Sequence, residues 1–457
     1  MKLHIYNSLT KEKDLFVVEN NLVKLYICGP TVYDKSHLGH ARVYVIFDII
    51  RNILENVFGY NVLYQMNITD IDDKILNLSD NDLNKANDIS KKYEDEFFKD
   101  LRNLDVKYPD YITRVTEHVD TIIEYIETIM ENGYAYKDKD GSIYFNIQKF
   151  SKDYKYDLLR INDSDGKDFA LWKSNNVGYD SPFGKGRPGW HIECSSMASK
   201  ILGNNITIHG GGIDLEFPHH NNELAQSNAY YKNKDCDWVK YFMHVGHLHI
   251  DGLKMSKSLK NFKTIQEMLE KYTSRQIRLL FILNNIWSSP MYFNVDTSMD
   301  SIVNVDKSIE NFINNTQPKN NYNTVINLTQ NDLELNEYLN DTLIKINDAY
   351  CDSFNISLVL TLIQNLINKT NTYMNNNNFN NELVIKVREN VLKHLNIFRL
   401  NYVEQNDLIQ NDLLQIIMNT REKLRTFAKD NKVNKLYSVT DDIRKQLSEM
   451  NIIINDN

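Results

Sequence analysis

Residues 22–40 of the chain read LVKLYICGPTVYDKSHLGH, and this stretch decides the fold. Leu22 to Ile27 is a short run of mostly apolar, β-prone residues that ends at Cys28, which predicts a buried strand. A helical apolar pattern follows from about His40 to Phe58, and strand-like residues resume at Asn61 to Met66. Strand, helix and strand in this order predict a parallel βαβ unit, whose ligands gather beyond the carboxyl ends of the strands.

Composition sets the broad class of the protein. A chain of 457 residues predicts about three domains at roughly 150 residues each. Its 52 basic and 61 acidic residues give a net charge of -9, which argues against a globally basic surface for nucleic acid but not against a local one. Four cysteines are too few to staple so long a chain, and no apolar signal or membrane-spanning stretch is present. We therefore expect a reduced, cytoplasmic protein that does not enter a membrane.

The middle and end of the chain differ in pattern. From about Asp82 to Gly133 the pattern is mostly helical, followed by a hairpin-like Tyr134 to Phe145 and a polar stretch to Pro188. We interpret this part as an insertion, because strand signals resume at Ile206 to His209 and at Val239 to His249. Beyond about residue 300, amphipathic segments without glycine predict a helical bundle. They lie near Ser301 to Asn314, Leu333 to Ala349, Ile356 to Tyr373 and Glu382 to Phe398.

The first group of candidate functional residues is His37, Gly39 and His40, at the mouth of the first predicted helix. Two imidazoles three residues apart fall on one face of the opening turn, beside backbone N–H groups that favour phosphate. Gly39 lets a ring or a phosphate approach the backbone. The alternative is a pair of exposed loop histidines, and the four-residue pattern alone does not decide between them.

The second group is the KMSKS sequence of residues 254–258. The ammonium groups of Lys254 and Lys257, with the hydroxyl of Ser256, suit an in-line displacement at phosphorus, where negative charge must be neutralised on oxygens that shift during the reaction. The alternative is an ordinary solvated surface loop.

The third group contains possible metal ligands. His219 and Glu223 are four apart in an apparently helical run that opens at Pro218, so they should project from one face. Together with the thiols of Cys28 and Cys194 they would make a donor set suited to Zn²⁺. The alternative is two buried cysteines and an ordinary His/Glu pair on a helix surface.

Two weaker patterns are rejected. Gly184, Gly186 and Gly189 match the dinucleotide-binding spacing, but no strand is predicted before them, so we interpret them as a loop. His247 and His249 alternate on a predicted strand without a third ligand, which is more typical of a solvated face.

Taken together, these stretches resemble class I aminoacyl-tRNA synthetases, and most closely the cysteinyl-tRNA synthetase family. The resemblance covers nearly the whole chain and its motifs occur in the family's order. They are CGPTVYD at 28–34, HLGH at 37–40, NITDIDDK at 67–74, GRPGWHIEC at 186–194, HGGG at 209–212, FPHH at 217–220, KMSKS at 254–258, and Asp352, Phe354 and Asn355 in the bundle.

The resemblance implies a role for each matching position. The zinc ligands would be Cys28, Cys194, His219 and Glu223. The cysteine substrate would contact Gly29, Thr69, Trp190, His209 and Asp214. ATP would bind at His37, Gly39, His40, Lys254, Ser256 and Lys257, of which His37, His40, Lys254 and Lys257 would be catalytic.

The resemblance also implies the reaction. The family activates L-cysteine with ATP to cysteinyl-adenylate and transfers it to the terminal ribose of tRNA(Cys). The implied cofactors are one Zn²⁺ per chain and Mg²⁺ with ATP, the implied partners are tRNA(Cys), L-cysteine and ATP, and a monomer is expected. Zinc would select the thiolate of cysteine over the hydroxyl of serine, so no editing domain is expected.

The predicted fold class is α/β: a Rossmann-type parallel-sheet catalytic domain with an insertion, followed by an α-helical bundle and a small C-terminal domain. The catalytic domain has two halves, 1–120 and 186–250, around a connective insertion at 121–185. Residues 251–305 form the KMSKS-loop and stem-contact region. Residues 306–402 form the tRNA-binding bundle, and 403–457 the C-terminal anticodon-binding region.

Two other functions remain open at this point. A cysteine ligase of the same lineage passes cysteine to an amino sugar and lacks the full anticodon-binding end. Here Arg421 to Leu436 holds six basic and two acidic residues, a local basic face that favours tRNA, although the chain stops at Asn457 where many family members continue. A catalytically inactive, tRNA-binding zinc protein is the other alternative, and intact His37, His40 and lysine positions argue against it.

Overall fold

The structure is a computed structural model that describes residues 2–159, 167–232, 238–250, 253–254, 262–283, 286–318, 328–375 and 379–402, with helical positions at 417, 420, 424 and 439–443. The chain divides into two compact units, Met1–Leu400 and Asn401–Asn457. The six basic residues of the segment Arg421 to Leu436 and most of the predicted C-terminal region lie outside the described residues.

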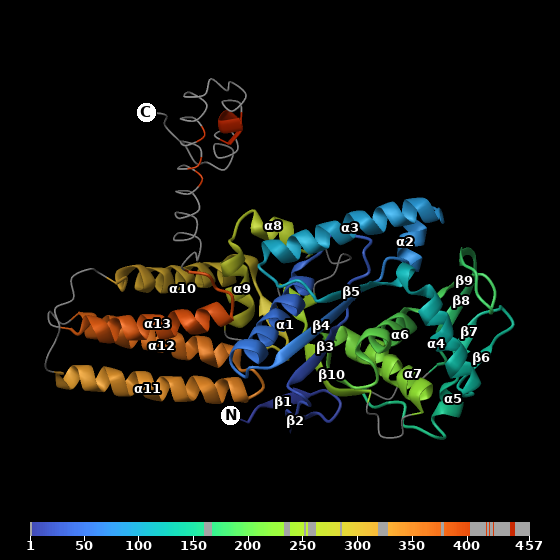
Figure 1. Ribbon diagram of the computed structural model, residues 1–457, viewed down its shortest axis with the longest axis horizontal. Helices are drawn as coiled ribbons and strands as arrows, with labels where there is room; N and C mark the ends of the chain where they lie inside the picture. Colours follow the sequence, from blue (N-terminus) through green and yellow to red (C-terminus); the bar gives the residue numbers. More distant parts are fainter. Residues whose placement is uncertain are drawn as a thin grey trace. The chain divides into compact units, whose positions relative to one another are not determined.

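A five-stranded parallel sheet forms the centre of the first unit (Figure 1). Its spatial order is β11-β10-β3-β4-β5. The strands are β3 (Leu22–Ile27), β4 (Asn61–Ile68), β5 (Tyr111–Arg114), β10 (Ile206–Gly212) and β11 (Val239–Val245). The predicted α/β class with a parallel sheet is therefore confirmed.

Helix α1 (Leu38–Asn56) connects β3 to β4 and completes the predicted βαβ unit. It begins two residues earlier than predicted, because the side chain of His37 caps its first turn and closes a capping box with His40. Its apolar residues are buried against the sheet along most of its length. The helix therefore carries the HLGH sequence at its N-terminal end and core residues behind it.

The order of the sheet reverses between β3 and β10, which is where open parallel sheets bind ligands. At this point Cys28 follows β3, and its backbone N–H donates to Gly210 O at 3.2 Å. Gly29 passes so close to the next strand that a Cβ at this position would lie 1.7 Å from Asn67 O. A larger residue is excluded there, and the backbone can line the cleft directly.

The chain from β4 to Pro188 contains strand β5, several helices and a second sheet. Its helices are α2 (Asp73–Leu78), α3 (Leu83–Asn103), α4 (Val119–Glu131) and α5 (Ile147–Phe150), with the 3-10 turn η1 (Val115–Glu117). Its sheet is antiparallel and contains β6 (Ala135–Lys137), β7 (Ile143–Phe145), β8 (Ala170–Tyr179) and β9 (Gly186–Pro188). The predicted hairpin is confirmed as β6 and β7.

Two strand predictions in this region and the next were wrong. The glycine-containing stretch before Trp190 was interpreted as a loop, but Gly186–Pro188 is strand β9 and pairs with β8. A Cβ at Gly186 would lie 2.3 Å from Lys173 O, so the glycine permits close pairing with β8. The run Val239 to His249 was predicted as one strand, but it divides after Val245 and its two parts join different sheets.

The small sheet after this division contains β12 (Leu248–Ile250), β13 (Leu253–Lys254) and β14 (Met291–Phe293). Helices α8 (Ile265–Leu269) and α9 (Ser274–Ile282) lie between β13 and β14 in the sequence. Helices α6 (Trp190–Leu202) and α7 (Asn221–Tyr231) flank β10, and an N-terminal hairpin contains β1 (His4–Asn7) and β2 (Glu12–Leu15). No helix in the described ranges is long and apolar enough to cross a membrane.

The last part of the first unit is a helical bundle, as predicted. Its helices are α10 (Val295–Asn315), α11 (Gln330–Cys351), α12 (Ile356–Met374) and α13 (Asn381–Ile397), and they lie alongside one another (Figure 1). Each corresponds to one amphipathic segment of the sequence. Their buried aliphatic residues form the core of the bundle.

A buried ion pair connects helix α1 to α9, next to the end of the bundle. The guanidinium of Arg278, in α9, is fully buried and donates to Asp48 Oδ2 of α1 at 2.6 Å. It also donates to Phe398 O, just after α13, at 2.9 Å and to Leu104 O at 3.1 Å. One side chain therefore connects α1, the end of α3 and the end of the bundle.

We expect Arg278→Met to lower the free energy of unfolding by about 3–5 kcal/mol, because it removes the closest cation from the buried Asp48 carboxylate and leaves only Arg399, whose Nε lies 3.9 Å away. The control is Lys13→Met, which breaks an exposed ion pair with Asp352 and should cost less than about 1 kcal/mol. Urea unfolding curves measure both values. Equal effects of the two changes would contradict the assigned importance of the buried pair.

Acid should destabilise the bundle through His394. Burial lowers the pKa of this imidazole to about 4, from an ordinary value near 6.5. Between these values the unfolded chain binds one more proton, so stability rises with pH from about 4 to 6.5 and is lost as the pH falls. We expect His394→Gln to make this dependence shallower by up to about 1.4 kcal/mol per pH unit in that window.

The matched control for this pH dependence is Tyr350→Phe. Tyr350 Oη lies 3.1 Å from His394 Nδ1, so the change removes the hydroxyl contact and keeps the buried imidazole. Unfolding free energies measured from pH 4 to 7 should show the wild-type slope in Tyr350→Phe and a reduced slope in His394→Gln. The same slope in all three proteins would contradict the prediction.

Candidate active site

A cavity of about 460 Å³ opens at the carboxyl ends of the parallel strands. It is bordered by the turn after β3, the first turn of α1, the start of α6 and the segments that follow β10 and β11. Of the predicted site residues, the lining includes Cys28, Gly29, His37, Gly39, His40, Trp190 and Asp214. The fold therefore brings the HLGH sequence and part of the predicted cysteine pocket to one cleft.

His37 and His40 stack on each other at the start of α1, with ring centroids 3.7 Å apart. His37 Nδ1 accepts from His40 N at 3.2 Å, and His37 N donates to His40 Nδ1 at 3.5 Å. In each ring Nδ1 is an acceptor, so a neutral imidazole carries its proton on Nε2 and can donate from there. The rings are thus held by the backbone they cap.

Burial lowers the pKa of both imidazoles, to about 3 for His37 and about 4 for His40. For His37 the neighbouring His40 lowers the pKa further. Both rings are therefore neutral hydrogen-bond donors at pH 7. They can contact phosphate oxygens beside the N-terminal N–H groups of α1, whose dipole also favours an anion.

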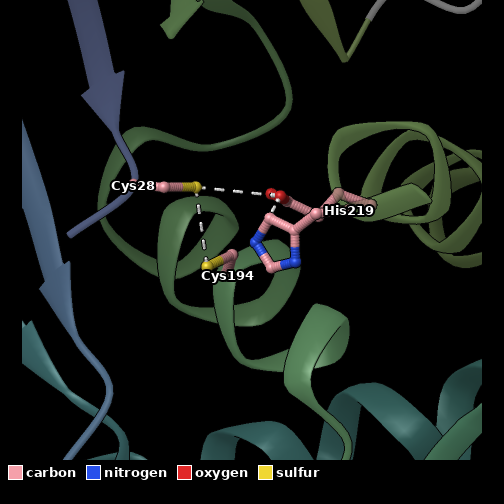
Figure 2. A group of neighbouring side chains, drawn as sticks. Cys28, Cys194 and His219 are labelled. Carbon is pink, nitrogen blue, oxygen red and sulfur yellow. Dashed lines mark hydrogen bonds and ion pairs between the residues drawn. The ribbon is translucent and has the colours of Figure 1, made fainter. Parts of the chain in front are cut away.

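The four predicted metal ligands meet in one cluster beside the cavity. Cys28 Sγ lies 3.8 Å from Cys194 Sγ and 3.8 Å from Glu223 Oε1, and His219 Nε2 lies 3.0 Å from Glu223 Oε1. Figure 2 shows Cys28, Cys194 and His219 pointing toward one another from separate elements. Their ligand atoms all lie within 4.8 Å of one another, and all four residues are buried.

The electrostatics of the cluster fit a divalent cation. Burial raises the pKa of Cys28, Cys194 and Glu223 and lowers the pKa of His219, so without a cation the charged form of each group is disfavoured. Two sulfurs, one imidazole nitrogen and one carboxylate oxygen are the donors that Zn²⁺ prefers. A bound cation would stabilise the thiolates and the carboxylate together.

The local backbone around His219 differs from the prediction. Residues Glu216–His220 form the π-type turn η3, which contains the extended residue Phe217, and α7 begins only at Asn221. His219 therefore lies in the turn and Glu223 in the first turn of the helix. Their side chains still meet, because the turn leads directly into α7.

His209 and His220 also reach this cluster. Cys28, His209, His220 and Glu223 form a second buried set of possible ligands. His220 Nε2 lies 3.4 Å from Cys28 Sγ, and its Nδ1 lies 2.7 Å from His244 Nε2. No role was predicted for His220 or His244 from the sequence, and the pairing of β10 with β11 brings His244 near the cluster.

The predicted cysteine pocket divides between the cavity and the protein interior. Gly29, Trp190 and Asp214 line the cavity, and the Trp190 ring lies 4.3 Å from the His219 ring, measured between centroids. Thr69 and His209 do not line it. Thr69 Oγ1 donates to Glu193 Oε2 at 3.2 Å, and His209 Nε2 lies 2.9 Å from Glu223 Oε2.

The KMSKS sequence is described only at its edge. The backbone of Lys254 pairs with His249 in the small sheet, while Ser256 and Lys257 lie outside the described residues. The chain that follows returns to the cleft, where Phe262 lines the cavity and Lys263 O accepts from Leu38 N at 3.0 Å. The end of this loop is therefore attached to the start of α1.

Comparison with known proteins identifies the family. A profile described as tRNA synthetases class I (C) catalytic domain matches residues 15–304. A cysteine–tRNA ligase of Encephalitozoon cuniculi is 39% identical over 100% of this chain and 97% of that protein. The chain belongs to the cysteine–tRNA ligase family. It is accordingly an enzyme of the ligase class, and the resemblance noted from the motifs is confirmed.

Other comparisons agree with this family. A cytoplasmic cysteine–tRNA ligase of Dictyostelium discoideum is 46% identical over 82% of this chain, which spans only 61% of that protein. A structure of Mycobacterium tuberculosis methionyl-tRNA synthetase with methionyl-adenylate has a TM-score of 0.62, covering 83% of this chain and 90% of that chain. At 14% identity this structure supports the shared fold alone.

We expect Cys194→Ser to lose zinc, because a neutral hydroxyl replaces a thiolate in the cluster. Zinc measured by elemental analysis should fall from about one ion per chain to a small fraction of that value after dialysis. The matched control is Cys351→Ser, at a half-buried cysteine of α11, which should keep its zinc. Unchanged zinc in Cys194→Ser would refute its assignment as a ligand.

Proposed function

We propose that the protein activates L-cysteine with ATP and transfers it to the terminal ribose of tRNA(Cys). One observation carries this proposal. One cavity is lined both by Cys28, a possible metal ligand, and by His37 and His40 at the start of α1. One end of the cavity suits a thiol and the other suits phosphates, as joining cysteine to ATP requires.

The first half-reaction needs positioning more than proton transfer. The cysteine carboxylate is ionised at neutral pH, so it attacks the ATP α-phosphorus without a general base and pyrophosphate leaves. His37 and His40 would donate to the phosphates, and Lys254 and Lys257 would neutralise the departing pyrophosphate. Gly39 and Ser256 would complete the ATP contacts, and Mg²⁺ would accompany ATP.

The thiol end would select the amino acid. Cys28, Cys194, His219 and Glu223 would hold one Zn²⁺, which when bound supplies a ligand position for the substrate thiolate. Trp190 lines the cavity, and its ring lies 4.3 Å from the His219 ring, measured between centroids. Gly29, Thr69, His209 and Asp214 would complete the pocket. Serine offers a harder, less acidic oxygen, so it would be rejected at this stage.

The remaining predictions concern the tRNA and the organisation of the chain. We propose that the bundle at 306–402 and the region 403–457 bind tRNA, and that residues 251–305 contact its stem. The catalytic halves 1–120 and 186–250 and the insertion 121–185 keep their predicted boundaries in this proposal. A monomer in the cytoplasm also stays a prediction.

A cysteine ligase that acts on an amino sugar is the second candidate. The alignment with the Encephalitozoon cuniculi protein covers nearly all of both chains, the bundle included, which favours tRNA as the acceptor. An inactive tRNA-binding protein is disfavoured, because His37 and His40 retain an ordered, cavity-facing arrangement.

Two assays test the proposal. Zinc-loaded protein should catalyse cysteine-dependent exchange of pyrophosphate into ATP, and should attach radiolabelled cysteine to tRNA(Cys). Serine at the same concentration is the control for selectivity and should give less than about 10⁻³ of the exchange rate, by the scale of sites that reject substrates lacking a key partner. Absence of exchange would refute both enzyme candidates, and exchange without tRNA charging would favour the amino sugar.

A further inference from the structure

Arg42 is a buried cation two residues after His40 in α1. Its side chain is only 1% exposed, and its two terminal nitrogens donate to four backbone carbonyls. The acceptors are Gly246 O at 2.7 Å, His247 O at 2.8 Å, Ser289 O at 2.7 Å and Trp287 O at 3.4 Å. A guanidinium can satisfy this many acceptors because its donors are fixed in a planar fork.

Arg42 differs from the other buried arginines of the same core. Arg278 pairs with Asp48, and Arg51 pairs with Glu55 and Asp110. Among the side chains that the structure describes, no carboxylate lies within ion-pair distance of Arg42. Burial lowers its pKa to about 10, so the group still carries its charge at pH 7. A buried charge balanced only by carbonyl dipoles is costly unless an anion binds nearby.

The four carbonyls belong to the segments that form one wall of the cavity. Gly246 and His247 connect β11 to β12 and line the cavity together with His37 and His40. Trp287 and Ser289 precede β14, which pairs in parallel with β12. On its other side β12 pairs with β13, which ends at Lys254.

The spacing between these segments is tight. Gly246 N donates to Trp287 O at 3.1 Å, and a Cβ at Gly246 would lie 2.2 Å from Ser289 O. Arg42 donates to carbonyls of both segments, 246–247 and 287–289, and does not itself line the cavity. It therefore connects α1, the helix that His37 caps, with the strand pair that leads into the KMSKS sequence.

We propose that Arg42 is a positioning residue for the ATP half of the cavity. Its side chain holds α1 and the wall at residues 246–248 at the separation that a nucleoside triphosphate requires. Its charge lies behind this wall and favours the anion in front of it. The inference rests on the proposed function, since that function supplies ATP as the ligand. It assigns no part to Arg42 in binding cysteine or zinc.

The test compares the effect of each variant on the KM for ATP with its effect on the KM for cysteine. In the pyrophosphate-exchange assay, Arg42→Lys, which keeps the charge and loses the fork, should raise the KM for ATP about tenfold, and Arg42→Met should raise it further. The KM for cysteine and the zinc content should stay within about twofold of wild type. Arg51→Lys is the matched control, in the same helix but paired with carboxylates, and should leave the KM for ATP unchanged.

A purely structural role would lower the melting temperature or kcat without separating the two KM values, and that result would overturn the proposal, as would an unchanged KM for ATP. Calorimetric titration with ATP alone gives the same comparison without cysteine. If wild type binds ATP but shows no exchange, the proposed function fails while the affinities of the variants still decide the role of Arg42. If wild type does not bind ATP, both fail.

A measurement on wild type covers the case in which both variants unfold. Amide hydrogen exchange should slow at residues 246–250 and 287–291 when ATP is added, and should change little when cysteine is added. Equal effects of the two ligands, or no effect of ATP on these segments, would overturn the proposal.

Discussion

The parallel pairing of β3 with β10 is the constraint on which the rest of the site depends. It places the end of β3, with Cys28, beside Gly210 at the end of β10. Since the sheet order reverses at this pair, the segments after the two strands diverge and leave the cleft between them. One segment leads to His37 at the start of α1, and the other leads to Glu223 in α7. Two chemically different ends of one cavity follow from a single strand pair.

Burial determines the chemistry at both ends of that cavity. Desolvation disfavours the charged forms of Cys28 and Glu223 at one end and of His37 at the other. These three groups are therefore neutral until a cation or a phosphate enters, whereas the ionisable side chains of Asp34, Lys35, Lys74 and Asp214 also line the cavity. Arg42 keeps its charge behind the wall of the cleft and bonds to backbone carbonyls.

Much of the fold and of the candidate site could be predicted because the signals are local. Strand, helix and strand patterns between residues 22 and 66 predict the βαβ unit, and regular amphipathic spacing predicts the four bundle helices. The predictions failed where pairing decides the outcome. Strand β8 is polar in sequence and is stabilised by pairing with its neighbours β7 and β9. The run after Val239 divides because its two parts pair with strands of different sheets.

The sequence by itself determined which donors are available: the imidazoles of the HLGH sequence, the thiols of Cys28 and Cys194, and the His219 and Glu223 pair. Residue type and short spacing can be read from the sequence before the tertiary structure is known. Only the tertiary structure decided that the four possible metal ligands meet beside the cavity that the HLGH imidazoles line, that His220 reaches this cluster and contacts His244, and that Arg42 bonds to the 246–247 wall. The physical reason is that burial and long-range contact depend on how strands pair, and neither is encoded in the spacing of neighbouring residues.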